Sequence, residues 1–476
     1  MSEKQKISGG HAPAFVDTGG TLFGHPKGLM VLFFTEMWER FSYYGLRGIL
    51  VLFLTSTTMG GFGWDNESAL LLLSIYTALV YIMSIPGGII ADKLIGQRKA
   101  VMYGGFTLVA GHFLMAVPTE VTFYLALALI VFGTGLLKPN ISTLVGGLYR
   151  QGDARRDAGF TIFYMGINVG ALLASIIVGY VGERIGWHYG FSLAGFGMLL
   201  GQLVFITGRK YLAHIVDIEK QDQIFTKDQA AAKPAHKGFT KKERDRILAI
   251  CLSFIIVLIF WASFEQASGL MNLYARDYTD RFVFGWEVPA SWLQGLNSFF
   301  IITTAPIVAW IWIALAKRNV NLSSIFKMGL GTAVLGIGFV YMVMAALERD
   351  GSGDGKSALS WLVLAYLFHT LGELALSPVS LSFITKVAPP RIVASMMGLY
   401  FAVTGMGNFL AGLIGIWAQR QGELEIFAGI AAVTILLGGL LMVLAKQINK
   451  LTHGTEYGHD EEKEAQTGQL LESSAS

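Results

Sequence analysis

The chain has 476 residues, of which 53% are apolar and only 14% are charged, and its formal net charge is +3. A water-soluble globular protein usually carries about 25% charged residues, so this composition excludes an ordinary soluble domain and predicts an integral membrane protein. The 57 glycines fit this view, since glycine is common where membrane helices pack closely. A single cysteine, Cys251, excludes a disulfide within one chain.

Several apolar segments along the chain are long enough to cross a membrane. A helix needs about 20 apolar residues to span a hydrocarbon core of ~30 Å. By this criterion we predict an all-α membrane protein with spans over residues 28–55, 69–91, 99–118, 121–148, 158–181, 188–208, 246–274, 291–316, 326–347, 358–381, 392–418 and 425–446. The twelve predicted helices form two six-helix bundles, an arrangement typical of transporters built from paired repeats.

A polar segment rich in Lys and Arg, residues 209–245, separates the sixth span from the seventh. The predicted division is therefore an N-terminal segment (1–27), a first bundle (28–208), a linker (209–245), a second bundle (246–447) and a tail (448–476). The tail is predicted to be disordered because it is acidic, rich in Ser and Gln, and without apolar runs.

The distribution of basic residues predicts the orientation, because cytoplasmic loops carry an excess of Lys and Arg. With a cytoplasmic N-terminus, 27 of the 36 Lys and Arg residues flank the cytoplasmic ends of the spans. Only six then lie outside: Arg184, Arg276, Arg281, Arg349, Lys356 and Arg420. We therefore predict a plasma (inner) membrane protein whose two termini, including 1–27 and 448–476, are cytoplasmic.

The first predicted span carries four charged residues, although ionisable groups are costly inside a bilayer. Their spacing places Glu36, Arg40, Tyr43 and Arg47 on one helical stripe. Glu39 lies on the same side, so this stripe cannot face lipid. One interpretation is a set of internal ion pairs that lock helices together. The interpretation that we favour is the wall of a charged cavity.

Three further charges fall deep within predicted spans, away from the span ends: Lys138, Glu265 and Glu373. Together with the first span they give four carboxylates against three cations. The extra carboxylate is what a site for a proton or for a substrate ammonium group needs. His369 lies one turn before Glu373 and can reach it, but we favour a packing role for this histidine.

The segment between the second and third spans combines glycines with charged residues. Gly88, Asp92 and Arg98 stand at the predicted cytoplasmic helix ends. Glycine permits close helix approach and tight turns, and the charges can latch the helices in one conformation. We predict a gating element here, at Gly88, Asp92 and Arg98.

Two motifs resemble those of known transporter families. The stretch around Asp92 is similar to the loop motif of the major facilitator superfamily. The string Glu36-x-x-Glu39-Arg40-Phe41-x-Tyr43-Tyr44-Gly45 resembles the hallmark of the proton-dependent oligopeptide transporters. Phe163-Tyr164-x-x-Ile167-Asn168-x-Gly170 and the surroundings of Lys138 and Glu265 fit the same family. The resemblance covers residues 28–446 and implies a major facilitator fold.

The resemblance further implies a bacterial-type symporter of di- or tripeptides with protons. Proton coupling would involve Glu36, Glu39, Arg40, Lys138 and Glu265. The peptide carboxylate would meet Arg47 and Lys138, and the peptide ammonium would meet Glu373. The complete expected substrate site is Tyr43, Tyr44, Arg47, Tyr81, Lys138, Asn168, Trp261, Asn297, Glu373 and Ser377.

Other functions remain open from the residues alone. Relatives within such a family also carry nitrate-like anions or other metabolites with protons, and this is the closest alternative. We expect no enzyme, because the sequence has no nucleophile–base pair, phosphate-binding loop or metal cluster. The expected partners are a small peptide, protons as the coupling ion and the lipid bilayer, with no nucleic acid and no other cofactor. The sequence carries no statement about oligomeric state.

Overall fold

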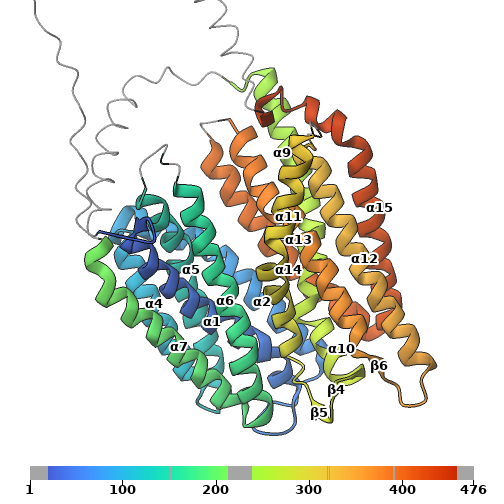
Figure 1. Ribbon diagram of the computed structural model, residues 1–476. Helices are drawn as coiled ribbons and strands as arrows, with labels where there is room; N and C mark the ends of the chain where they lie inside the picture. Colours follow the sequence, from blue (N-terminus) through green and yellow to red (C-terminus); the bar gives the residue numbers. More distant parts are fainter. Residues whose placement is uncertain are drawn as a thin grey trace, which may run out of the picture.

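The structure is a computed structural model that describes residues 20–149, 153, 155–212, 238–318, 320, 322–389 and 392–457. Within these ranges the chain forms two groups of long helices that lie side by side (Figure 1). Residues 1–19, which belong to the predicted N-terminal segment, lie outside the described part.

The first group contains the helices that precede the linker. They are α1 (Lys27–Thr55), α2 (Asn66–Ile82), α3 (Ser84–Ile90), α4 (Gln97–Met115), α5 (Glu120–Gly147), α6 (Arg155–Arg184) and α7 (Trp187–Gly208). A π-helical turn, Ala91–Ile95, continues α3, and a 3₁₀ turn, Arg209–Leu212, follows α7. We call this group the N bundle.

The second group contains the helices that follow the linker. They are α9 (Lys241–Phe264), α10 (Leu270–Tyr278), α11 (Trp292–Lys317), α12 (Ser324–Gly351), α13 (Leu359–Val387), α14 (Val393–Gln421) and α15 (Glu423–Lys450). Two 3₁₀ turns belong to it, η3 (Glu265–Ser268) between α9 and α10, and η5 (Thr455–Tyr457) after α15. We call this group the C bundle.

Short strands occur only in the connections of the described residues. An antiparallel hairpin of β1 (Thr21–Leu22) and β2 (His25–Pro26) precedes α1, and a second hairpin of β4 (Phe282–Val283) and β5 (Trp286–Glu287) precedes α11. A parallel pair joins β3 (Thr279–Asp280) to β6 (Ser357–Ala358).

The predicted twelve-helix, two-bundle fold is confirmed. Each predicted span corresponds to one helix or to one set of consecutive helical pieces. In the part of the chain that the structure describes, ten of these segments are long and apolar enough to cross a membrane by themselves. The segments outside this set are α1, with its buried charges, and α4, which begins with Gln97, Arg98 and Lys99.

Two predicted spans are broken rather than continuous. The second span consists of α2, α3 and the π turn, and the seventh consists of α9, η3 and α10. In the seventh span the chain bends at Gly269, whose φ and ψ are −109° and −94°. The bend places Glu265 and Ser268 on a 3₁₀ turn that lies between two helices, and discontinuous helices often carry the binding groups of transporters.

The predicted linker and tail differ in extent from the structure. A capping box at Thr240 and Glu243 starts α9 at Lys241, five residues before the predicted span. The tail prediction began too early, because α15 continues to Lys450 and the chain then turns into η5. The buried side chain of Glu456 accepts a hydrogen bond from the Ser324 amide at the start of α12. This contact fixes the segment after α15 against the C bundle. Residues 213–237 and 458–476 lie outside the described part.

Both described ends of the chain lie at the same end of the bundles. The β1–β2 hairpin, the start of α9 and η5 all lie at the top of Figure 1, and the β4–β5 hairpin lies at the bottom. We call these the linker end and the gate end of the protein. An even number of crossings produces this arrangement.

The polar contacts between the two bundles gather toward the gate end. Glu183 on α6 accepts hydrogen bonds from the amides of Ala290 and Ser291, 2.9 and 2.8 Å long, before α11. Asn66 donates to Gln419 at 2.8 Å, and Arg420 pairs with Glu67 at 2.5 Å. These contacts join α6 to α11 and α2 to α14, so the described bundles are closed against each other at this end.

A glycine contact fixes α3 against α5 within the N bundle. A Cβ atom at Gly87 would lie 1.9 Å from the carbonyl oxygen of Gly135, whereas a Cβ at Gly88 would have no heavy atom within 4 Å. The sequence prediction placed close approach at this glycine pair and chose Gly88 as the gating residue. The structure assigns the close approach to Gly87 instead.

We expect Gly87→Ala to destabilise the protein by about 1–3 kcal/mol, because the new methyl group must push α3 away from α5. The matched control, Gly88→Ala, adds the same methyl group without a clash and should keep or slightly raise the melting temperature. Thermal unfolding of both variants in detergent measures the difference. Equal melting temperatures would contradict the packing described here.

Candidate functional site

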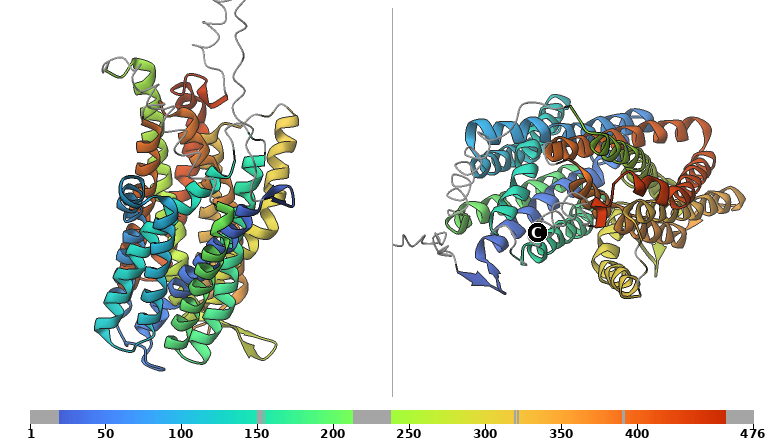
Figure 2. Two further views of the ribbon diagram at one scale, coloured as in Figure 1. Left: turned by 90° about the vertical axis from the view of Figure 1, so that its left-hand side faces the viewer. Right: turned by 90° about the horizontal axis from the view of Figure 1, so that it is seen from above.

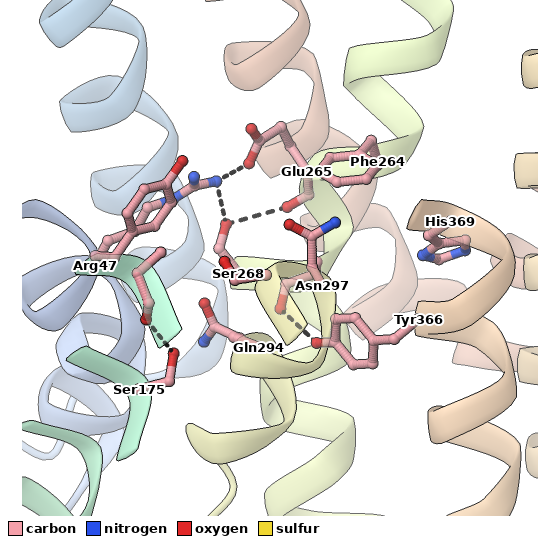
Figure 3. Close-up of a pocket in the computed structure, with 13 residues that line it drawn as sticks. Arg47, Ser175, Phe264, Glu265, Ser268, Gln294, Asn297, Tyr366 and His369 are labelled. Atoms are coloured by element: carbon pink, nitrogen blue, oxygen red, sulfur yellow. Dashed lines mark hydrogen bonds and ion pairs between the residues drawn. The ribbon is translucent and has the colours of Figure 1, made fainter. Parts of the chain in front are cut away.

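A polar cavity lies between the bundles, roughly midway along α1. Its volume is about 50 Å³, and Figure 3 draws the 13 residues that line it. They come from α1, α6, α9, η3, α11 and α13: Tyr44, Arg47, Ala171, Ser175, Phe264, Glu265, Ala267, Ser268, Gln294, Asn297, Ser298, Tyr366 and His369. Side chains from both bundles therefore face one space.

Arg47 joins the two bundles at this cavity. Its guanidinium forms an ion pair with Glu265 and donates a 2.9 Å hydrogen bond to the hydroxyl of Ser268 (Figure 3). Both partners lie on η3, and all three side chains are buried. Nearby, Asn272 and Gln294 donate to the backbone oxygen of Gly48, at 3.0 and 3.2 Å, which fixes α1 against the C bundle.

Glu36, Glu39 and Arg40 form a second buried cluster, about two to three turns before Arg47 on α1. Arg40 lies 3.0 Å from Glu36 and also pairs with Glu39, so one cation serves two carboxylates. The guanidinium lies 5.2 Å from the ring centre of Tyr43. These two ion pairs lie within one helix, whereas the Arg47–Glu265 pair does join two helical segments, as the alternative interpretation proposed.

Lys138 is the cation nearest to this cluster from another helix. Its Nζ lies 3.8 Å from the centre of the Tyr81 ring, close enough for a cation–π contact between α5 and α2. Arg40, Glu39 and Glu36 act on the ammonium group electrostatically. Its predicted grouping with the first-span carboxylates therefore has a physical basis.

Glu373 lies on the C-bundle side, on α13. Asn297 on α11 donates a 2.8 Å hydrogen bond to the Glu373 carboxylate and a 3.1 Å hydrogen bond to the hydroxyl of Thr370. In the described residues Glu373 has no cationic partner. A buried carboxylate whose partner is a neutral amide is suited to receive an external cation.

The remaining predicted binding residues are less tightly grouped. Tyr43 stacks edge-on against Tyr44, with ring centres 5.2 Å apart. Asn168 is buried and bonds to the backbone oxygen of Tyr164 on its own helix. Trp261 packs against Phe264 at 5.3 Å, and Ser377 is half-buried on α13. None of Tyr43, Asn168, Trp261 and Ser377 lines the described cavity, so their assignment to the substrate site stays a prediction.

Several residues in or beside the cavity carried no sequence signal. Ser268 and Thr370 are ordinary hydroxyl residues in apolar surroundings, and only the fold reveals that they bond to Arg47 and Asn297. His369 packs against Phe339, with ring centres 4.6 Å apart, as a packing histidine should. It also lines the cavity, and in the described part of the chain its ring nitrogens bond to no protein group, Glu373 included.

The predicted gating latch is open in this structure. Asp92 is exposed on the π turn, and among the described residues it forms no ion pair. Arg98 instead donates a long, 3.4 Å hydrogen bond to the backbone oxygen of Leu212, after α7. The tight turn itself is made by Gly96, at a φ of +80° that favours glycine.

The site is suited to holding a molecule that is charged at both ends. Arg47 lines the cavity and Glu373 adjoins it through its hydrogen bond to the lining residue Asn297, whereas Lys138 is not among the lining residues. The described residues contain no group of three or more His, Cys, Asp or Glu that could hold a metal ion. The arrangement therefore provides charge-assisted hydrogen bonds and carboxylates that can take up protons.

Removing the cation of the Arg47–Glu265 pair should be strongly destabilising. We expect Arg47→Met to cost about 3–5 kcal/mol because Glu265 is left buried without a partner. The double variant Arg47→Met/Glu265→Gln should regain most of that loss, since both charges are gone. Thermal unfolding of the purified protein in detergent measures both values.

Arg420→Met is the control, because it breaks an exposed Arg–Glu pair between the same two bundles. Its cost should stay below about 1 kcal/mol. If Arg47→Met were no more harmful than Arg420→Met, the buried pair would have no special role in stability.

Comparisons with known proteins agree with this geometry. A family model described as the POT family matches residues 98–230 and 216–423. The chain is 35% identical over 497 residues to the peptide transporter YePEPT of Yersinia enterocolitica, with 92% of this chain and 97% of that protein covered. It is also 35% identical over 492 residues to a di-/tripeptide transporter of Lactococcus lactis, with 91% and 98% covered.

The fold is similar to solved structures of such proteins. A mutant of the peptide transporter POT, crystallised in complex with alafosfalin, superposes with a TM-score of 0.82 at 38% sequence identity. The match covers 91% of this chain and 97% of that one. Sequence and fold similarity thus extend over both bundles.

Proposed function

Because this chain belongs to the POT family, the proton-dependent oligopeptide transporters, we propose that it carries di- and tripeptides into the cell together with protons. It is a transporter that works by alternating access between two helical bundles, rather than an enzyme. The observation that supports the proposal is a pair of opposite, buried charges on different bundles: Arg47 lines the cavity, and Glu373 bonds to Asn297, which also lines it.

A free peptide fits this charge arrangement. Its carboxylate meets Arg47 and Lys138, and its ammonium meets Glu373, so the separation of these groups selects for a short chain with both ends unblocked. Asn297 orients the Glu373 carboxylate through a 2.8 Å hydrogen bond. Side-chain identity matters less, because apolar surfaces such as Phe264 tolerate many shapes.

Proton coupling follows from the buried ion pairs. A proton on Glu265 neutralises the partner of Arg47 and releases the guanidinium for the peptide carboxylate. A proton on Glu36 or Glu39 relieves the crowding of two carboxylates on Arg40. Each proton that enters down a membrane potential supplies about 2.3 kcal/mol per 100 mV, and this energy drives accumulation if it changes the balance between the two bundle arrangements.

The closed gate end supports an inward-facing state for this structure. With α2–α14 and α6–α11 held together there, access to Arg47 is from the linker end. The excess of Lys and Arg at the linker end supports a cytoplasmic location of that end, in the plasma (inner) membrane. The described state is then inward-facing, and both termini are cytoplasmic.

Purified protein in liposomes should accumulate a dipeptide when a proton gradient is directed inward, and a protonophore should abolish the accumulation. We expect Glu36→Gln and Glu39→Gln each to lose this gradient-driven uptake but to retain exchange of labelled for unlabelled peptide, since the substrate-binding charges remain. Uptake and counterflow of a labelled dipeptide are the measurements.

Glu120→Gln provides the control, because it removes an exposed carboxylate at the start of α5 and should leave both activities unchanged. Normal accumulation in Glu36→Gln and in Glu39→Gln would show that these carboxylates are structural. Accumulation that persists after the gradient has collapsed would remove the coupling claim.

Glu373 should recognise the peptide ammonium specifically. We expect Glu373→Gln to weaken binding of a free dipeptide by about 1.5–3 kcal/mol, the usual value of a hydrogen bond to a charged group. N-acetylated dipeptide lacks the ammonium, so it should bind both proteins with the same weak affinity. Competition against a labelled dipeptide measures all four affinities.

A C-terminally amidated dipeptide serves as the matched ligand, because it keeps the ammonium. Its affinity should still fall in Glu373→Gln. If the substitution weakened the N-acetylated and free peptides equally, Glu373 would not contact the ammonium group.

A further inference from the structure

Two hairpins at opposite ends of the molecule share an unusual turn. β1–β2 turns at Phe23-Gly24, and β4–β5 turns at Phe284-Gly285. Both phenylalanines have a φ of 52°, and the glycines have φ values of 78° and 79°. Two positive φ values in a two-residue loop define a type I′ turn.

Phenylalanine is a poor residue for the first position of this turn. The position favours Asn, Asp or Gly, because a bulky side chain is disfavoured at positive φ. Such strain persists where the surroundings or the function require it. What each turn gains from the phenylalanine is an aromatic ring at the tip, and the rings of Phe23 and Phe284 are 84% and 104% exposed.

The surface of both tips is apolar. Leu22 is exposed beside Phe23, and Phe282, Val283 and Trp286 are exposed beside Phe284. Between Phe282 and Trp286 the sequence contains no charged residue. Exposed aromatic groups of this kind mark binding surfaces rather than ordinary solvent-facing loops.

Polar contacts fix both hairpins. In the first, His25 lies 2.9 Å from the Tyr149 hydroxyl, and Arg155 donates at 3.0 Å to the backbone oxygen of Gly24, within the turn itself. In the other hairpin, Glu287 pairs with Arg281 at 2.7 Å and with Arg184 of α6 at 3.0 Å. These contacts fix both hairpins, and therefore their tips, against the rest of the protein.

The position of the hairpins indicates what the tips contact. One hairpin belongs to each bundle and to each end of the molecule, and in the left view of Figure 2 both project sideways rather than along the helices. We propose that the two Phe-Gly hairpins are membrane anchors, whose tips lie in the interface between headgroups and acyl chains of opposite leaflets.

A lipid bilayer is the occupant that explains both tips. It presents the same boundary at the two ends of the protein, whereas a protein partner would have to cover two separate patches. Aromatic rings are enriched at this boundary. Trp286 also stacks near Trp292, at 5.2 Å, and Trp292 bonds to the backbone of α6 beside the exposed Ile177 and Tyr180. Exposed aromatic and apolar side chains thus occur both on this hairpin and on α6, to which Trp292 bonds.

Spin labels at the two tips test the proposal in the full chain. Cys251→Ser removes the single native cysteine, and Phe23→Cys or Phe284→Cys then carries one nitroxide in each variant reconstituted into phospholipid nanodiscs. We expect labels at the tips to be several-fold more accessible to oxygen, relative to a water-soluble nickel complex, than labels at the matched exposed positions Lys241→Cys and Asp354→Cys. Oxygen concentrates in lipid and the nickel complex in water.

The outcomes are distinct. Preferential oxygen access at both tips supports the anchors. If the label at either tip is as accessible to the nickel complex as the label at its control position, the proposal is overturned for that hairpin. A third outcome is strong dipolar coupling between labels on two copies of the same variant in liposomes, with no coupling in nanodiscs that hold one copy. This result would show that the tip contacts a second copy of the chain, and it would also overturn the anchor proposal.

Discussion

The Arg47–Glu265 ion pair is the interaction on which the rest of the site depends. It lies in an apolar interior, where the attraction between opposite charges is large and an unpaired charge is very costly. It also connects the two halves of the molecule, because Arg47 belongs to α1 and Glu265 to η3. In the proposed mechanism a change in the protonation of Glu265 would therefore affect both anion binding and the contact between bundles.

The second cluster has a different electrical character. Arg40 is shared by Glu36 and Glu39, so the group carries an excess negative charge that only Lys138, held over the Tyr81 ring, partly offsets. The two carboxylates therefore share a single guanidinium within one turn of α1. In the proposed mechanism the first cluster would bind the substrate anion, and the second would take up the accompanying proton.

The sequence predicted the helices and the buried charges well, because both signals are local. A long apolar run specifies a span, and a charge inside it must face a polar interior, as Glu36 and Arg47 do. Contacts between distant segments were not predictable in this way. The hydroxyl of Ser268, the closer approach at Gly87 rather than at Gly88 and the docking of Glu456 depend on how helices are rotated against each other. The bend at Gly269, likewise, requires a backbone conformation that hydropathy does not report.

The charges on α1 also affect how the protein enters the membrane. Each charged residue near the centre of a helix disfavours its insertion by about 2.5–3.5 kcal/mol, so α1 is a poor membrane segment when it stands alone. In the folded chain it is covered by α6 and α7, which are synthesised after it. We therefore expect α1 to insert stably only once α6 and α7 have been synthesised and can cover its charges. The charged residues of α1 would in this way make the N bundle assemble as a unit.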